Sequence, residues 1–349
     1  MPATTILSRA WVCALLAACL LVSPLSPTRA AAPRQEPAAY TTPLGIALET
    51  LPYPHPVKFL SMDVEGEPVR FAYMDVAPTG TANGRSVVLL HGKNFYGSYW
   101  EDTIRALTAA GFRVVVPDQI GFGKSSKPDI PYSFDLLAAS TIRLLDTLNV
   151  AKAAVVGHSM GGMLAVRLVR NYPDRFTHLV LENPIGLEDY RFAVPPQPIE
   201  KLYENELNDT DPAKIRAFHK RYFVTWKPEA YERFVEVRAR VALSGEFPRW
   251  AKASARTYQM IHQQPVRHEF VLIRTPALLV IGQEDRTVVG GNFVSEEVRK
   301  TLGQYPQLGK AAARDIPGSK LVEMPGVGHI PHLEAADAFH RDLLAFLKP

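Results

Sequence analysis

The chain has 349 residues, of which 47% are hydrophobic and 21% are charged, and its formal net charge is +4. This balance disfavours a nucleic-acid-binding protein, because no basic stripe with interleaved aromatic residues occurs along the chain. No apolar run reaches the length that spans a membrane. The composition therefore predicts a globular protein with one large core, or with one core and a lid.

The N-terminal residues 1–30 have the pattern of a signal peptide. Residues 11–22 form an apolar stretch that is too short to span a bilayer comfortably, and Thr28 and Ala30 are small residues suited to cleavage after Ala30. We therefore predict a periplasmic or secreted protein whose exported chain starts with a leader over 31–56.

The two cysteines, Cys13 and Cys19, both lie inside this N-terminal segment. An exported chain that begins after residue 30 would hold no disulfide. An alternative stays open, because residues 16–19 read Leu-Ala-Ala-Cys, which is typical of a lipoprotein signal with Cys19 as the lipid-bearing residue. The apolar residues 20–22 favour ordinary cleavage, so we expect no stable membrane insertion unless Cys19 is lipidated.

Beyond the leader, the hydrophobic pattern changes twice. Residues 57–64 and 69–76 alternate apolar and polar side chains and predict a hairpin with Glu65-Gly66-Glu67 as its turn. From residue 86, strand patterns alternate with helix patterns, which predicts a mostly parallel sheet with helices on both faces. Ser133 is a suitable N-cap for one of these helices. Strands are expected at 86–91, 113–117, 152–157, 177–182, 277–282 and 319–324, and helices at 98–110, 133–148, 160–171 and 334–347.

Residues 187–270 interrupt this alternation. Their pattern is helical, and Asp211-Pro212 and Lys227-Pro228 are typical helix starts with proline in the first turn. Because the segment lies between two expected core strands, we predict a helical cap. The core would then consist of 57–186 and 271–349.

The sequence Gly157-His158-Ser159-Met160-Gly161 lies between an expected strand and an expected helix. A serine on such a turn is held clear of the sheet, and its neighbours must be small because the two backbones pass close together. Ser159 is therefore a candidate nucleophile. The side chain of His158 is expected to point along the turn and to act on the site only indirectly.

A nucleophilic serine needs a base, and the base needs an acid that orients it. Asp285 follows an expected strand further along the chain, and His329 lies in a glycine-rich loop after the next one. In a parallel sheet these positions meet Ser159 at the carboxyl ends of the strands. The three residues are therefore candidates for one catalytic triad.

Other residues compete for these roles. His332 is an alternative base, and Glu182, at the end of another expected strand, is an alternative acid. Glu284 is adjacent to Asp285 and is expected to point elsewhere. Asp118 and the glycines after it are expected to shape a turn near the site.

These residues together resemble the α/β-hydrolase family, and the resemblance covers most of residues 86–349. It implies Ser159 as nucleophile, His329 as general base and acid, and Asp285 as the residue that holds His329. It also implies an α/β fold with a mostly parallel central sheet and a helical cap insertion. The motifs that carry it, in the order of the family, are residues 87–92 with Trp100 downstream, 118–125, 157–161, 282–285 and 328–329.

The same resemblance implies an oxyanion hole. In this family one donor is the backbone N–H after the nucleophile, here that of Met160. The second comes from the loop after the His-Gly pair, here from Lys93 or Asn94. Carbon–carbon bond hydrolases of the family usually carry a glycine-rich stretch here, and Lys93-Asn94-Phe95 departs from it.

We interpret the chain as a serine hydrolase that cleaves carboxylic esters of small or medium acyl chain through an acyl-Ser159 intermediate. The expected partner is a small-molecule ester with an apolar portion, and neither a nucleic acid nor a cofactor is expected. No metal is expected either, since no H-E-x-x-H spacing occurs. Relatives that act on haloalkanes or epoxides carry aspartate in place of Ser159.

Several alternatives to an esterase remain. They are an amide, lactone or carbon–carbon bond hydrolase, an acyltransferase, and an inactive binding protein that has kept the fold. Because all three triad candidates fall outside 187–270, the cap is expected to affect substrate preference more than it affects the triad chemistry.

Overall fold

The computed structural model describes residues 40–348, so the expected signal peptide and the first part of the leader lie outside the described residues. Within this range no helix is long and apolar enough to cross a membrane. Eight strands form one sheet. They are β1 (Val57–Val64), β2 (Glu67–Val76), β3 (Ser86–Leu90), β4 (Arg113–Pro117), β5 (Ala153–His158), β6 (Phe176–Glu182), β7 (Ala277–Gly282) and β8 (Lys320–Met324).

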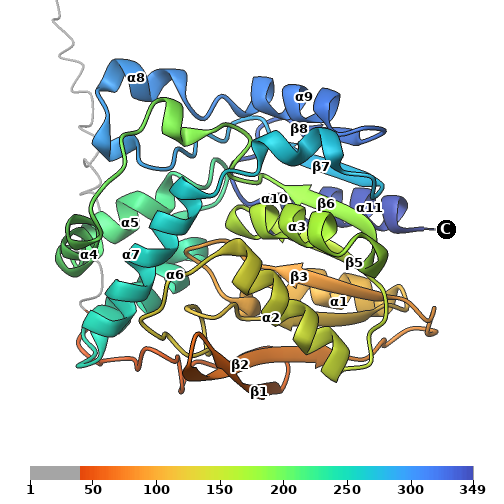
Figure 1. The fold of residues 1–349 in the computed structure, drawn as a ribbon, viewed down its shortest axis with the longest axis horizontal. Coiled ribbons are helices and arrows are strands. Elements are labelled where there is room, and N and C mark those ends of the chain that lie inside the picture. Colours follow the sequence, from red (N-terminus) through yellow and green to blue (C-terminus); the bar gives the residue numbers. More distant parts are fainter. Residues whose placement is uncertain (1–39, 349) are drawn as a thin grey trace, which may run out of the picture. The chain divides into compact units, whose positions relative to one another are not determined.

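The order of the strands across the sheet is β1-β2-β4-β3-β5-β6-β7-β8 (Figure 1). The pairs β1–β2 and β2–β4 are antiparallel, and all other pairs are parallel. This is the mostly parallel sheet that the alternating pattern predicted. The C-terminal ends of β5, β7 and β8 lie at the same edge, which is where Ser159, Asp285 and His329 follow.

Helices cover both faces of the sheet (Figure 1). In β3, Val88 and Leu90 pack into one apolar layer and Val87 and Leu89 into the other, because successive side chains of a strand point to opposite faces. The first layer is completed by α2 (Phe134–Thr147), α3 (Met160–Asn171) and α9 (Tyr305–Asp315), and the second by α1 (Glu101–Ala109) and α11 (Ala336–Leu347).

The predicted cap residues form four helices between β6 and β7, where α4 packs on α7 and α5 on α6. Pro212 and Pro228 occupy the first turns of α5 and α6, as the two dipeptides predicted. The cap helices are α4 (Ile199–Asn208), α5 (Pro212–Lys220), α6 (Pro228–Ala242) and α7 (Phe247–Gln263), and two short helices, α8 (Glu296–Thr301) and α10 (Pro331–Glu334), lie further along the chain.

The hairpin turn is shorter than predicted. Glu67 pairs with Val64, so it belongs to β2 and not to the turn. The two remaining residues, Glu65 and Gly66, have φ angles of 51° and 80°. Positive φ at both central positions is typical of the two-residue turn that matches the twist of the flanking strands.

The predicted leader over 31–56 is wrong for its second part. Residues 40–56 pack against the cap: Leu44 is 2% exposed, and its N–H donates to the carbonyl of Arg240 in α6 at 3.0 Å. Leu44, Ile46 and Leu48 join Val241 in a small apolar cluster. Burial of three apolar side chains at alternate positions helps to order a segment that has no helix or strand.

This packing predicts that Leu44 contributes to stability. Leu44→Ala is expected to lower the free energy of unfolding by about 2–4 kcal/mol, because it removes buried methyl groups and leaves a cavity. Leu243→Ala, the same substitution at a residue that is 46% exposed, is the matched control and should change it by less than about 0.5 kcal/mol. Denaturant titration of both variants measures the difference, and equal small effects would mean that residues 40–56 do not pack as described.

Candidate active site

Ser159 sits on a strained turn between β5 and α3. Its φ and ψ are 55° and −120°, a conformation that residues with a side chain rarely adopt. A Cβ at Gly157 would lie 2.2 Å from the carbonyl oxygen of Gly161, and one at Gly161 would lie 2.3 Å from that of Leu90. Glycine is therefore required on both sides of the turn, and Met160 begins α3 directly after the serine.

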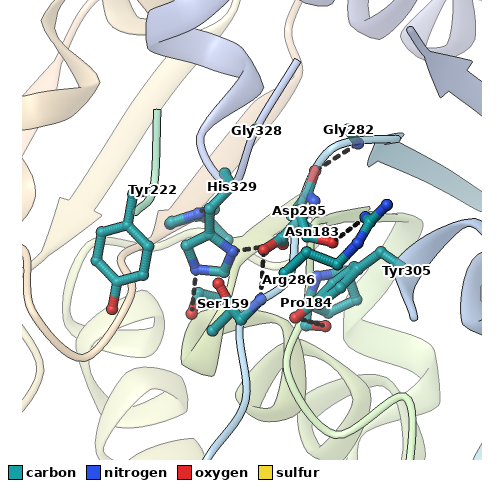
Figure 2. Close-up of polar contacts among 12 residues, drawn as sticks. Ser159, Asn183, Pro184, Tyr222, Gly282, Asp285, Arg286, Tyr305, Gly328 and His329 are labelled. Carbon is teal, nitrogen blue, oxygen red and sulfur yellow. Dashed lines mark hydrogen bonds and ion pairs between the residues drawn. The ribbon is translucent and has the colours of Figure 1, made fainter. Parts of the chain in front are cut away.

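Figure 2 shows Ser159, His329 and Asp285 in one hydrogen-bonded row. The His329 Nδ1–H donates to Asp285 Oδ2 at 2.6 Å, and His329 Nε2 lies 3.0 Å from Ser159 Oγ. Because the carboxylate only accepts, the proton of the neutral ring is on Nδ1, and Nε2 is free to accept the serine proton. The structure thus brings together the three residues proposed as the triad.

Asp285 is held as a carboxylate. Burial alone would raise its pKa, but His329 and hydrogen bonds from Thr287 and Asn183 lower the pKa below the usual value. The Thr287 N–H donates to Oδ1 and the Asn183 Nδ2–H to Oδ2, each at 2.8 Å. Asn183 also accepts the Gly282 N–H at 2.8 Å, so one side chain joins the ends of β6 and β7.

The competing acid and base lie together in a second pair. Glu182 Oε1 accepts the backbone N–H of His332 at 2.7 Å and its Nδ1–H at 2.9 Å. Burial raises the pKa of Glu182 to about 7. Within residues 40–348, neither side chain hydrogen-bonds Ser159 or His329, and the pair instead ties the end of β6 to the start of α10.

His158 acts on the site only indirectly, as expected. Its Nε2–H donates to the backbone carbonyl of His329 at 2.9 Å, and its Nδ1 accepts the Tyr99 hydroxyl at 3.0 Å. Burial, reinforced by the nearby His329, holds the pKa of His158 well below its usual value, so the ring is neutral. The Tyr99 oxygen in turn accepts the Gly92 N–H at 3.1 Å, which connects the loop after β3 to the histidine loop.

The loop after β3 is the expected source of the second oxyanion donor. Since the Gly92 N–H is already bonded to Tyr99, the next N–H groups, those of Lys93 and Asn94, are the candidates. Lys93, Asn94 and Ser159 all line the same cavity. The Asn94 side chain is fixed by its Nδ2–H, which donates to the hydroxyl of Tyr222 in the cap at 2.8 Å.

Asp118 shapes the neighbouring turn, as its position predicted. Its Oδ1 accepts the Gly97 N–H at 2.6 Å, and its Oδ2 accepts the Lys124 N–H and the Tyr53 hydroxyl, each at 2.7 Å. A Cβ at Gly123 would lie 2.2 Å from Oδ2. Glu284 lines the same cavity as Ser159, and within residues 40–348 its side chain makes no hydrogen bond to Ser159, Asp285 or His329.

A cavity of about 880 Å³ opens above Ser159, between the core and the cap. Much of its wall is apolar. Its charged groups are partly paired across the core–cap boundary: Lys93 Nζ donates to Ser254 Oγ at 2.7 Å, and this hydroxyl donates to Glu206 at 2.8 Å. In the described part of the chain, no group of three or more His, Cys, Asp or Glu side chains could hold a metal ion.

The chain belongs to the alpha/beta hydrolase fold family, whose model matches residues 85–336. It is similar to a probable hydrolytic enzyme from Pseudomonas aeruginosa PAO1, with 43% identity and a TM-score of 0.86 over 89% of this chain and 100% of that one. The structure of an enol-lactonase from Burkholderia xenovorans LB400 matches with 25% identity and a TM-score of 0.64, over 82% and 99% of the two chains.

A hydrolase from Burkholderia vietnamiensis is 28% identical over 295 residues, which are 83% of this chain and 95% of that protein. Its name gives its substrates as 2-hydroxy-6-oxononadienedioate and 2-hydroxy-6-oxononatrienedioate. The chain is therefore a hydrolase of the α/β fold. Its relatives are named for different substrates.

Substitution of Asp285 and of Glu182 tests directly which carboxylate orients His329. Asp285→Asn is expected to lower kcat by about four orders of magnitude, because an amide no longer holds the imidazole in the required tautomer. Glu182→Gln is the matched control, and we expect a much smaller loss because Glu182 contacts His332. Steady-state kinetics of both variants checks this, and a severe loss for Glu182→Gln with a mild one for Asp285→Asn would assign the acid to Glu182.

Proposed function

We propose that this hydrolase cleaves carboxylic esters through an acyl-Ser159 intermediate. The observation that carries the proposal is the unbroken row of hydrogen bonds from Asp285 through His329 to the hydroxyl of Ser159. A serine hydroxyl is a weak nucleophile until a positioned base accepts its proton. The Nε2 of His329, 3.0 Å from Oγ, is placed to meet that requirement.

In the first half of the reaction, Ser159 Oγ attacks the ester carbonyl carbon and its proton moves to His329 Nε2. The carbonyl oxygen becomes an oxyanion, for which we propose the backbone N–H groups of Met160 and Lys93 as donors. The intermediate then expels the alkoxide, which takes the proton from His329 and leaves as the alcohol. Asp285 stays ionised throughout and stabilises the imidazolium.

In the second half, water attacks the acyl-enzyme and gives its proton to His329. Collapse of the second intermediate breaks the bond to Ser159 Oγ, which recovers the proton. The products are the carboxylic acid and the free enzyme, so atoms and charges balance without a cofactor.

The cavity favours an ester with an apolar portion. Its volume of about 880 Å³ lies within the range of small-molecule sites, roughly 300–1,000 Å³. Apolar side chains of both the core and the cap line it, among them Phe122, Ile185, Phe234 and Ile261. Burial of the substrate's apolar part against these side chains would provide most of the binding free energy.

The relatives support a second candidate on the same residues. The enol-lactonase is similar over nearly its whole length, and a lactone is a cyclic ester that would follow the same two half-reactions. The dienedioate hydrolase is likewise similar over 95% of its length. The test of substrate class therefore includes a lactone and the diacid named for that relative.

The proposed function predicts both a labelling pattern and a substrate pattern. A fluorophosphonate probe is expected to label the wild-type protein at Ser159, and nitrophenyl esters of short and medium acyl chain are expected to be hydrolysed faster than the lactone or the diacid. Ser159→Ala should lose both activities and keep its thermal midpoint, because only one small side-chain atom is removed. Labelling that persists in Ser159→Ala would contradict the assignment of Ser159 as the nucleophile. Faster turnover of the diacid would indicate that the enzyme cleaves carbon–carbon bonds rather than esters.

We also propose that the protein is exported, on the strength of the apolar stretch 11–22 and the small residues before position 31. The expected product begins at Ala31 and carries no thiol. Intact-mass measurement on protein from the native host checks this expectation. A mass that starts at Cys19 with added acyl chains would instead indicate a lipoprotein at a membrane surface.

A further inference from the structure

The loop that carries His329 is bonded to the cap at its backbone. The His329 N–H donates to the carbonyl of Tyr222, two residues after α5, at 2.8 Å. The contact requires glycine beside it, because a Cβ at Gly328 would lie 2.4 Å from the same carbonyl oxygen. The cap therefore reaches the catalytic loop through the main chain, which a sequence pattern does not reveal.

The side chain of Tyr222 makes two further contacts at the site. Its ring lies next to the His329 imidazole (Figure 2), with the ring centroids 4.7 Å apart and the ring planes at 26°. Its hydroxyl accepts the Nδ2–H of Asn94 at 2.8 Å, and Asn94 belongs to the loop proposed to supply an oxyanion donor. One cap residue thus contacts both sides of the proposed reaction centre.

Glu334, at the end of α10, holds the contact between the His329 loop and the cap from the core side. Its Oε2 accepts the Gly328 N–H at 2.6 Å, and its Oε1 accepts the Val224 N–H at 2.5 Å and the Thr225 hydroxyl at 3.0 Å. The carboxylate therefore joins the residue before His329 to the cap residues that follow Tyr222. Ion–dipole hydrogen bonds of this kind are stronger than neutral ones.

We propose that Tyr222 is a positioning residue that holds the His329 imidazole in line with Ser159, with Glu334 securing the cap segment that carries it. This inference rests on the proposed function, in which His329 is the base. It gives the cap a role in positioning the base, in addition to the expected role in substrate preference. Displacement of the 222–225 segment would withdraw the carbonyl and the ring from His329, so the base is in place only when the cap is.

The test is a double-mutant cycle between Tyr222 and His329, in which kcat and KM are measured for an activated ester. Tyr222→Leu is expected to lower kcat by about ten- to a hundred-fold with little change in KM, because a misplaced catalytic group costs rate at this scale. In the His329→Ala background the same substitution should have no further effect on the residual rate, because Tyr222 acts through the imidazole. Tyr222→Phe keeps the ring and should recover most of the kcat.

Phe247→Leu is the matched control. Phe247 is also a buried aromatic of the cap, but it lies outside the 222–225 segment and stacks on Trp250. It should lower the thermal midpoint and leave kcat near the wild-type value. If Tyr222→Leu proves too unstable to assay, Glu334→Ala tests the same contact from the core side and should likewise lower kcat only when His329 is present.

The outcomes separate the two proposals. Full activity in His329→Ala would overturn the proposed function itself. A large loss in His329→Ala, with either an unchanged kcat in Tyr222→Leu or an equal loss from Tyr222→Leu in both backgrounds, would overturn only the positioning role of Tyr222.

Discussion

The geometry of the site depends on how firmly one imidazole is held. His329 lies in a glycine-rich loop, which has little intrinsic preference for a single conformation. Separate parts of the chain fix it: Asp285 accepts from its ring, His158 donates to its carbonyl and Tyr222 accepts its N–H. Because these contacts come from the ends of β5 and β7 and from the cap, the position of the ring requires the whole fold.

The same contacts connect the base with the loop opposite it. His158, Tyr99 and the Gly92 N–H form one hydrogen-bonded path from the histidine loop to the loop after β3. Asn94 and Tyr222 form a second path on the cavity side. Preorganised donors stabilise developing charge without rearrangement during the reaction, so rigid links between the base and the oxyanion loop favour acyl transfer.

The sequence predicted the sheet closely and indicated three residues that the structure brings together, because these signals are local. Each buried strand is a short apolar run, and the turn at Ser159 excludes side chains larger than hydrogen at Gly157 and Gly161. The contacts of Asn183, Tyr222 and Glu334 were missed, since each depends on segments that are distant along the chain. Helix α9 was missed because Gly309 interrupts its pattern, although a Cβ there would lie 2.9 Å from the Ile281 side chain in β7.

The central claim is that bond cleavage proceeds through a covalent ester on Ser159. Rapid quenching during turnover of an activated ester, followed by peptide mass mapping, tests this most directly. The account predicts the mass of the acyl group on the peptide that contains Ser159, with no adduct on other peptides. Turnover that leaves Ser159 unmodified in the pre-steady-state phase, or an acyl group on another residue, would contradict it.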